Sequence, residues 1–307
     1  MQESCEEGSP ALPSRPAPYL SWMDRTTTAL IVCFAVAPVS LSAAPDTTRI
    51  GTGTLIIAGG GYGAGVLEAF ARFAGGSNAV VFYIPSASSG IRLPSGFIWS
   101  PPEEKDATHN TGDFERELAA LLRVGRVRVL HSRERQHWEG ALADSLRAAS
   151  AVWLSEGNAG RLADLLLDTR AEKELAALLH RGGVIGGNSA GGIITGSFIV
   201  RGRPDKPVLM ARGRDRGFGW LPDVAINPHL TEAKRENELI NVVDAHPELL
   251  GIGIDEKAAL VVRGTEFEVI GEGRIAIYDD KIRDGHWYYY LSPGNRFSLV
   301  RREVMGR

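Results

Sequence analysis

The chain has 307 residues, of which 44% are hydrophobic, so it can bury a core larger than that of a typical small domain. Its 34 basic and 37 acidic side chains nearly cancel, and the sequence contains no long basic run. This balance excludes an electrostatic footprint for nucleic acid or for an anionic membrane surface. We therefore expect a globular protein that acts on a small or peptidic partner.

The first 43 residues have the pattern of an export signal. From Met23 the chain carries one basic residue, Arg25, then an apolar stretch, and then small residues near Ala43 that suit cleavage. The apolar stretch is shorter than the roughly 20 residues of a spanning helix, which makes a retained membrane anchor the weaker alternative. We predict a leader at 1–43, a single α/β domain at 44–307, export to the periplasm or the extracellular space, and no stable membrane insertion after processing.

Strands and helices are predicted to alternate from residue 52 onward. TLIIAGG (54–60) and AVVFYIPSAS (79–88) have the composition of strands, and VLEAFARFAGG (66–76) between them has helical spacing. The alternation continues through helices near 113–125, 141–149 and 161–183 and strands near 127–132, 151–157 and 184–187. This order predicts an α/β fold, with a mostly parallel central sheet, helices on both faces and functional sites at the carboxyl ends of the strands. The shorter strands of the last hundred residues predict a β-rich C-terminal section.

The glycine cluster GGGYGA (59–64) fits a dinucleotide fingerprint after a strand. The next strand ends on Pro85 and Ser86, where a ribose-binding acid is needed, so we favour a tight turn that requires small residues. No cluster of side chains has metal-ligand spacing, and we expect neither a cofactor nor a metal.

A second cluster, GNSAG (187–191), fits the G-x-S-x-G pattern of a nucleophile elbow and follows an apolar run. In that arrangement the Ser189 hydroxyl stands clear of the sheet, and the amide of Ala190 points toward a developing oxyanion. The second oxyanion donor has to come from a neighbouring strand end, and we choose the amide of Gly157.

A serine nucleophile needs a base and an acid that orients the base. His229 follows the apolar run VAI, which places it at a strand end, whereas His246 has the pattern of a surface residue at a helix start. Between Ser189 and His229 the candidate acids are Asp205, Asp215 and Asp223. The last two lie in turns, so we predict Asp205 as the acid.

These segments together resemble one family over residues 52–300: the serine peptidases that include aspartyl dipeptidase and cyanophycinase. The resemblance is carried by the GGG turn, WLSEGNAGRL, GNSAGG, DKPV, INPHLT and GIGIDEKAALVV (251–262). It implies a fold like that of class I glutamine amidotransferases, a Ser189, His229 and Asp205 triad, and oxyanion donors at Gly157 and Ala190. It further implies substrate binding by Asn158 and Arg235, and a homodimer.

The chain also departs from the family pattern. Glu156 stands where the family has a glycine, Ala159 where cyanophycinase has a glutamine, and Ala233 and Glu238 where it has arginines. These departures favour small peptides with an aspartyl residue on the acyl side over the polymer cyanophycin. Arg235 would then hold the aspartyl carboxylate as a charge-assisted pair. An esterase with a G-x-S-x-G elbow and a non-catalytic binding module are the alternatives.

Overall fold

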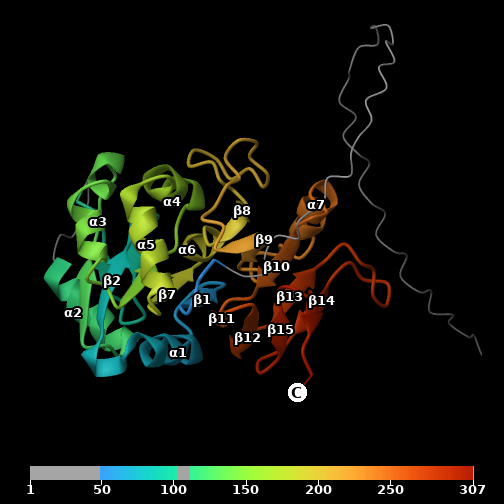
Figure 1. Ribbon diagram of the computed structural model, residues 1–307, viewed down its shortest axis with the longest axis horizontal. Helices are drawn as coiled ribbons and strands as arrows, with labels where there is room; N and C mark the ends of the chain where they lie inside the picture. The colour runs from blue at the N-terminus through green and yellow to red at the C-terminus, as the bar shows by residue number, and fades with distance from the viewer. Residues whose placement is uncertain (1–48, 103–110, 307) are drawn as a thin grey trace, which may run out of the picture. The chain divides into compact units, whose positions relative to one another are not determined.

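Two large β-sheets organise residues 49–102 and 111–306, the part of the chain that the computed structural model describes (Figure 1). These residues belong to one compact unit. The leader predicted at 1–43 lies outside the described residues and stays a prediction.

The larger sheet has nine strands and combines a parallel half with an antiparallel half. In spatial order its strands are β16 (Glu303–Val304), β15 (Arg296–Ser298), β12 (Glu266–Gly271), β11 (Ala258–Arg263), β1 (Thr54–Ala58), β7 (Val184–Asn188), β6 (Ala151–Leu154), β2 (Val80–Ile84) and β5 (Arg126–Val129). From β1 to β5 every neighbouring pair is parallel, so these five strands present their carboxyl ends at one edge. From β1 to β16 every pair is antiparallel.

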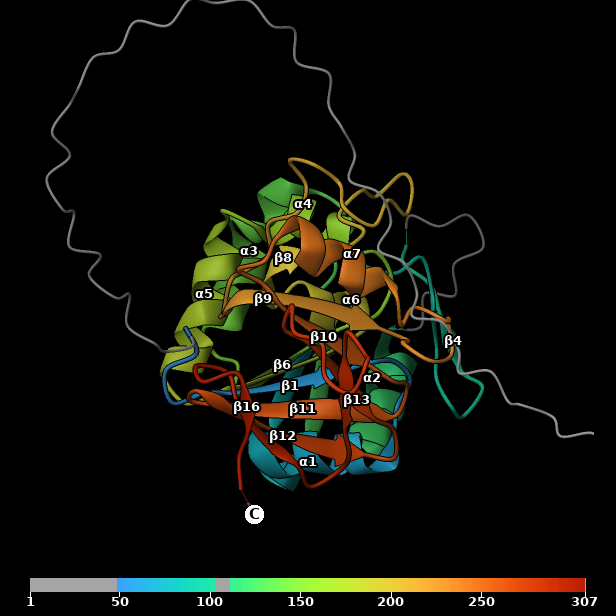
Figure 2. The same ribbon diagram turned by 90° about the vertical axis from the view of Figure 1, so that its right-hand side faces the viewer.

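Helices cover both faces of the parallel half because its strands are apolar on both sides. Along β1, Ile56 and Ala58 face the core that contains α1 (Ala64–Ala74) and α2 (Thr111–Leu122). The alternate residues Leu55 and Ile57 face the opposite core. There they meet α3 (Ala141–Leu146), α4 (Ala159–Leu166), α5 (Arg170–His180) and α6 (Ala190–Ile193). Figure 2 shows α1 below the sheet and α3, α4 and α5 above it.

The second sheet has five strands and packs on the same side of the larger sheet as α6. Its order is β14 (Tyr289–Leu291), β13 (Ile275–Tyr278), β10 (Leu250–Ile254), β9 (Leu221–Pro228) and β8 (Gly196–Ile199). The edge strand β8 and its neighbours β9 and β10 are parallel to one another. The last helix, α7 (Glu238–Ala245), contacts β10. The carboxyl ends of β9 and β10 therefore lie side by side at one edge of this sheet.

The predicted α/β architecture with a β-rich C-terminal section is confirmed, with two differences. The C-terminal strands are shared between the two sheets, which local periodicity does not encode. The single helix predicted at 161–183 is two helices, α4 and α5, because Asp168 has a positive φ of 60° and Thr169 caps α5. Shorter elements complete the fold: a hairpin of β3 (Ile91–Arg92) and β4 (Ile98–Trp99), and the 3₁₀ turns η1 (Gly76–Asn78) and η2 (Arg135–Trp138).

None of the helices in the described ranges has both the length and the apolar character needed to cross a membrane.

Candidate active site

Ser189 lies at a strained turn between β7 and α6. Its φ is 50° and its ψ is −111°, a conformation that non-glycine residues rarely adopt. The turn is tight because α6 packs onto the end of β6, where a Cβ on Gly191 would come 2.2 Å from the carbonyl oxygen of Leu154. The Ser189 amide donates to the carbonyl of Ala58 at 3.1 Å, which fixes the turn against β1. This is the geometry of a nucleophile elbow.

His229 follows β9 directly and brings its ring to Ser189. Its Nε2 lies 2.9 Å from the Ser189 Oγ. The His229 backbone also has a positive φ, 54°, and its amide donates to the carbonyl of Gly59 at 3.2 Å. The ring lies against Gly60, where a Cβ would come 2.4 Å from the ring carbon Cε1. The first glycine cluster is thus a turn that leaves room for the histidine.

Glu256, in the turn between β10 and β11, is the third side chain of this site, and it contacts the His229 ring. Its Oε1 lies 2.7 Å from the Nδ1 of His229. In the register of the second sheet Ile254 pairs with Pro228, so the residues that follow these two strand ends are neighbours. The Glu256 amide donates to both carboxylate oxygens of Glu232 at 3.1 Å, which holds the turn in place.

The structure corrects the prediction of Asp205 as the orienting acid. Asp205 is exposed and forms two hydrogen bonds with Arg203, at 2.8 and 2.7 Å. The Arg203 guanidinium lowers the pKa of Asp205 to about 2. The place beside the His229 ring belongs to Glu256 instead.

These contacts determine which nitrogen of His229 carries the proton. An ionised carboxylate can only accept a hydrogen bond, so beside Glu256 the Nδ1 of His229 is the protonated nitrogen. Its Nε2 is then an acceptor that faces the Ser189 hydroxyl. This arrangement lets the imidazole take the serine proton while Glu256 stabilises the imidazolium that forms.

The two predicted oxyanion donors are Gly157, in the segment after β6, and Ala190, the residue that follows Ser189. Gly157 lines the same cleft as Ser189, and Ala190 is the first residue of α6. Among the described residues, neither the amide of Gly157 nor that of Ala190 donates to a protein acceptor. Gly157 has a φ of 130°, and a Cβ there would come 2.3 Å from the carbonyl oxygen of Ala87, so only glycine fits.

The cleft around Ser189 has a volume of about 450 Å³ and carries charges of both signs. Two arginines line it. Arg201 donates to Asn227 Oδ1 at 2.9 Å and pairs with Glu238. Arg235 donates to the carbonyl of Pro228 at 3.1 Å, and no described carboxylate forms an ion pair with it. Burial lowers the pKa of Arg235, the charge of Arg201 lowers it further and Glu238 raises it, so an anion in the cleft would stabilise its charged form.

Asn158 also lines the cleft, but its amide is used within the protein. Its Oδ1 accepts from the amide of Arg161 at 2.9 Å as the N-cap of α4, and its Nδ2 donates to the carbonyl of Arg203 at 3.3 Å. The predicted role of Asn158 in substrate binding stays a prediction.

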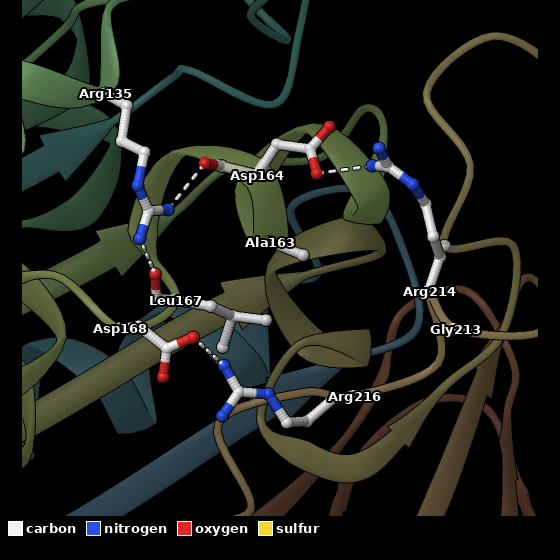
Figure 3. Close-up of a pocket in the computed structure, with 9 residues that line it drawn as sticks. Arg135, Ala163, Asp164, Leu167, Asp168, Gly213, Arg214 and Arg216 are labelled. Carbon is white, nitrogen blue, oxygen red and sulfur yellow. Dashed lines mark hydrogen bonds and ion pairs between the residues drawn. The ribbon is translucent and has the colours of Figure 1, made fainter.

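A second hollow lies between α4 and the segment 213–216, and its arginines are already paired (Figure 3). Arg214 and Arg216 pair with Asp164 and Asp168, and Arg135 donates to two backbone carbonyls of the α4 segment. These contacts satisfy the guanidinium groups, so the cleft at Ser189 is the stronger candidate. Within the described residues, no group of three or more potential ligands could hold a metal ion.

The sequence motifs predict Ser189 and His229, but they predict neither Glu256 nor the place of Arg201 in the cleft. An acid between the serine and the histidine is the order of one class of hydrolase, and Glu256 follows the histidine instead. The usable signal was the apolar run GIGI (251–254), which ends directly before Asp255 and Glu256 and so places them at another strand end. Arg201 carried no local signal, because its place in the cleft depends on how β8 packs beside β9.

A serine nucleophile, a histidine and an acid at the strand ends of an α/β fold define the class of serine hydrolases. The chain matches the model of peptidase family S51 over residues 54–270. It is 32% identical over 286 residues to the cyanophycinase of Trichormus variabilis, covering 85% of this chain and 89% of that protein. It is 29% identical over 223 residues to the cyanophycinase of Geminocystis herdmanii, covering 71% and 76%. The chain therefore belongs to peptidase family S51 and is a hydrolase of the serine peptidase class.

Solved structures share the fold at low sequence identity. A peptidase from an acI-B1 actinobacterium superposes with a TM-score of 0.60 at 21% identity, covering 80% of this chain and 97% of that one. A peptidase E-like protein from Listeria monocytogenes superposes with a TM-score of 0.50 at 18% identity, covering 71% and 98%. At these identities the likeness supports the fold alone.

Proposed function

We propose that this chain is a serine peptidase that hydrolyses the bond after an aspartyl residue in small peptides, through Ser189, His229 and Glu256. The observation that carries the proposal is the unbroken line of hydrogen bonds from Ser189 through His229 to Glu256, at 2.9 and 2.7 Å, in an open cleft. His229 takes the hydroxyl proton as the Ser189 oxygen attacks the peptide carbonyl. The amides of Gly157 and Ala190 stabilise the oxyanion that results.

The collapse of that intermediate releases the leaving amine, which takes the proton from His229, and leaves an acyl ester on Ser189. Water then attacks the ester with the same histidine as the base. Hydrolysis restores the free serine and releases the acyl product as a carboxylate.

Arg235 supports the aspartyl preference. Its guanidinium lines the cleft without an ion pair to a described carboxylate, so it is a ready partner for the side-chain carboxylate of a substrate. The relatives named cyanophycinase act on cyanophycin, and that polymer belongs in the test beside small peptides.

The test is a panel of purified substrates: α-aspartyl dipeptides, β-aspartyl dipeptides, cyanophycin and p-nitrophenyl esters, incubated with the wild type and with Ser189→Ala. We expect hydrolysis of an aspartyl peptide by the wild type and a loss of roughly 10⁴-fold or more in Ser189→Ala. The far-UV circular dichroism of the variant controls for folding. Hydrolysis of esters alone favours an esterase, and no turnover of any substrate favours a binding module; either result overturns the proposal.

A further inference from the structure

The proposed function gives no role to the carboxylate of Glu156, which lies in the same cleft. Glu156 lines the cleft beside Gly157 and is only partly exposed. Within residues 49–102 and 111–306 its carboxylate forms no hydrogen bond and no ion pair. A partly buried carboxylate without a partner is unfavourable, so its presence in a binding cleft calls for a ligand that compensates it.

The backbone around Glu156 is held on both sides, so this carboxylate is not carried by a loose loop. The amide of Ser155 donates to the carbonyl of Ile84 at 3.0 Å, and the amide of Asn158 donates to the carbonyl of Ala87 at 3.0 Å. Gly157 is fixed between them by its close approach to Ala87. Such a rigid support is what a specificity residue requires.

In the described part of the chain no lysine or arginine forms an ion pair with Glu156, and His229 and Glu256 are the charged neighbours that act on its carboxyl. Burial raises the pKa of the Glu156 carboxyl, His229 lowers it, and the neighbouring Glu256 raises it again. The hydroxyl groups of Tyr62 and Tyr83 also feel its charge, and burial raises the pKa of Tyr62 to about 12, which keeps that phenol neutral. The charges that act on the pKa of Arg235 are those of Arg201 and Glu238, and not that of Glu156. The cleft thus has an anionic position at Glu156 and a separate cationic position at Arg235.

We propose that the Glu156 carboxylate selects substrates that carry a positively charged group, an ammonium or a guanidinium, close to the scissile bond. This inference rests on the proposed function and deepens it, because it names the charge pattern of the substrate: a carboxylate for Arg235 and a cation for Glu156. Two sources supply the cation, a free α-amino group on the acyl residue or a basic side chain on the leaving residue. Both would meet Glu156 through charge-assisted hydrogen bonds.

The experiment uses direct binding to the full chain with Ser189→Ala, so that it does not depend on turnover. Calorimetric titrations compare an aspartyl-lysine dipeptide with its N-acetylated form and with an aspartyl-norleucine dipeptide, in the linkage that the substrate panel selects. We expect removal of the relevant cation to weaken binding about tenfold. Glu156→Gln in the same background should abolish that difference in affinity. The control is Glu68→Gln, which removes an exposed carboxylate of α1 that pairs with Arg123, and it should keep the difference.

The outcomes separate the two proposals. If the N-acetylated peptide binds more weakly, the α-ammonium is the partner of Glu156. If the norleucine peptide binds more weakly, the basic side chain is the partner. If all three peptides bind equally, or if Glu156→Gln keeps the preference, the role of Glu156 is overturned while the proposed function stands. If no peptide binds, both proposals fall. Steady-state ratios of kcat/KM for the same pairs, with and without Glu156→Gln, give a second readout that a merely structural role would not move.

Discussion

The partly buried carboxyl of Glu156 makes the stability of the fold depend on pH. Because burial raises its pKa above the usual 4.5, the folded protein binds the proton more tightly than the unfolded chain. The contribution of this group to stability is therefore fully present below about pH 4.5 and is lost as the pH rises through the raised value. Ionised His229 would oppose this trend, and Glu256 reinforces it.

Glu156→Gln removes that unfavourable ionisation and should raise the urea midpoint of unfolding at pH 7. The gain should shrink as the pH falls and vanish below about pH 4, where the wild-type carboxyl is protonated in both states. Equilibrium urea unfolding of both proteins at several pH values measures the effect. A variant that is less stable than the wild type at pH 7 would mean that Glu156 has a stabilising partner in the protein.

Asp205 and Glu256 differ in the side chain that each carboxylate contacts: Arg203 for Asp205 and His229 for Glu256. The local sequence DKPV predicts Asp205 as the acid, yet the Asp205 carboxylate accepts from Arg203, two residues away in the chain. Glu256 reaches His229, 27 positions away in the chain, through the pairing of β9 with β10. Ser189 and His229 were predictable because a motif and a strand end are local features. The acid depended on a contact that the linear order does not reveal.

At the scale of single elements, the turn after β1 leaves the space that the His229 ring occupies. Gly60→Ala would place a methyl group 2.4 Å from Cε1 and 2.6 Å from Nδ1 of His229, so the ring has to move. A displacement of about 1 Å can reduce turnover on the order of 10²-fold, and we expect a loss of at least tenfold in kcat. Gly65→Ala in α1 is the control, because the added methyl group would lie 3.7 Å from the Cα of Gly271, an ordinary contact distance. Equal activity of the two variants would show that the ring is not held by this turn.

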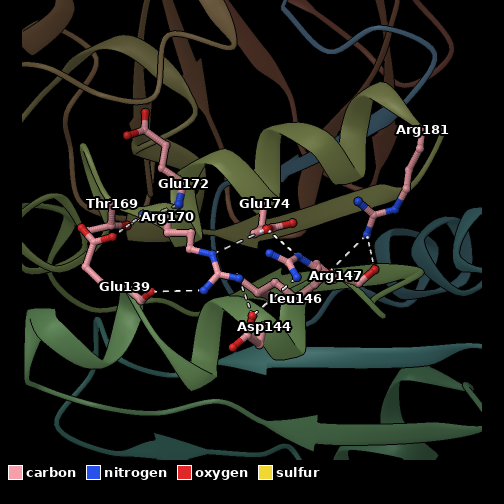
Figure 4. A network of polar contacts seen from close by, with 9 residues as sticks. All are labelled: Glu139, Asp144, Leu146, Arg147, Thr169, Arg170, Glu172, Glu174 and Arg181. Atoms are coloured by element: carbon pink, nitrogen blue, oxygen red, sulfur yellow. Dashed lines mark hydrogen bonds and ion pairs between the residues drawn. The ribbon is translucent and has the colours of Figure 1, made fainter.

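The helices α3 and α5 lie on the same face of the nine-stranded sheet, and a network of ion pairs and hydrogen bonds joins them (Figure 4). Arg181, at the end of α5, donates through Nη2 to the carbonyls of Leu146, Arg147 and Ala149 at 3.2, 3.1 and 3.0 Å. These carbonyls end the α3 segment, where the helix provides no further amides. The Leu146 carbonyl also accepts from the amide of Ala149 at 3.1 Å, so Arg181 adds a charged donor to this end. Arg170 pairs with Asp144 across the same two helices.

Arg181→Ala should therefore lower the free energy of unfolding by about 1 kcal/mol, because several carbonyls lose one charged donor. Thermal and urea unfolding measure the change, and Lys173→Ala on the exposed side of α5 is the control. Peptidase activity at 25 °C should be the same in both variants, since the network lies away from the Ser189 cleft. A stability equal to that of the wild type would show that water replaces Arg181 at these carbonyls.

At the scale of the whole described unit, the candidate site is assembled from two sheets. Ser189 follows β7 of the nine-stranded sheet, whereas His229 and Glu256 follow β9 and β10 of the five-stranded sheet. The alternation of strands and helices predicted the parallel half of the larger sheet. It could not predict the second sheet, because the choice of partner by an antiparallel or late strand depends on contacts distant in the sequence. The substrate cleft therefore exists only when the two sheets are docked.

We propose that Glu256, and not Asp205, orients His229 for the attack by Ser189. The direct measurement is kcat for Glu256→Gln and Asp205→Asn on the best aspartyl substrate, with circular dichroism as the control for folding. We expect kcat to fall about 10²- to 10⁴-fold in Glu256→Gln and to change by no more than about twofold in Asp205→Asn. A large loss in Asp205→Asn together with near wild-type turnover in Glu256→Gln would contradict it.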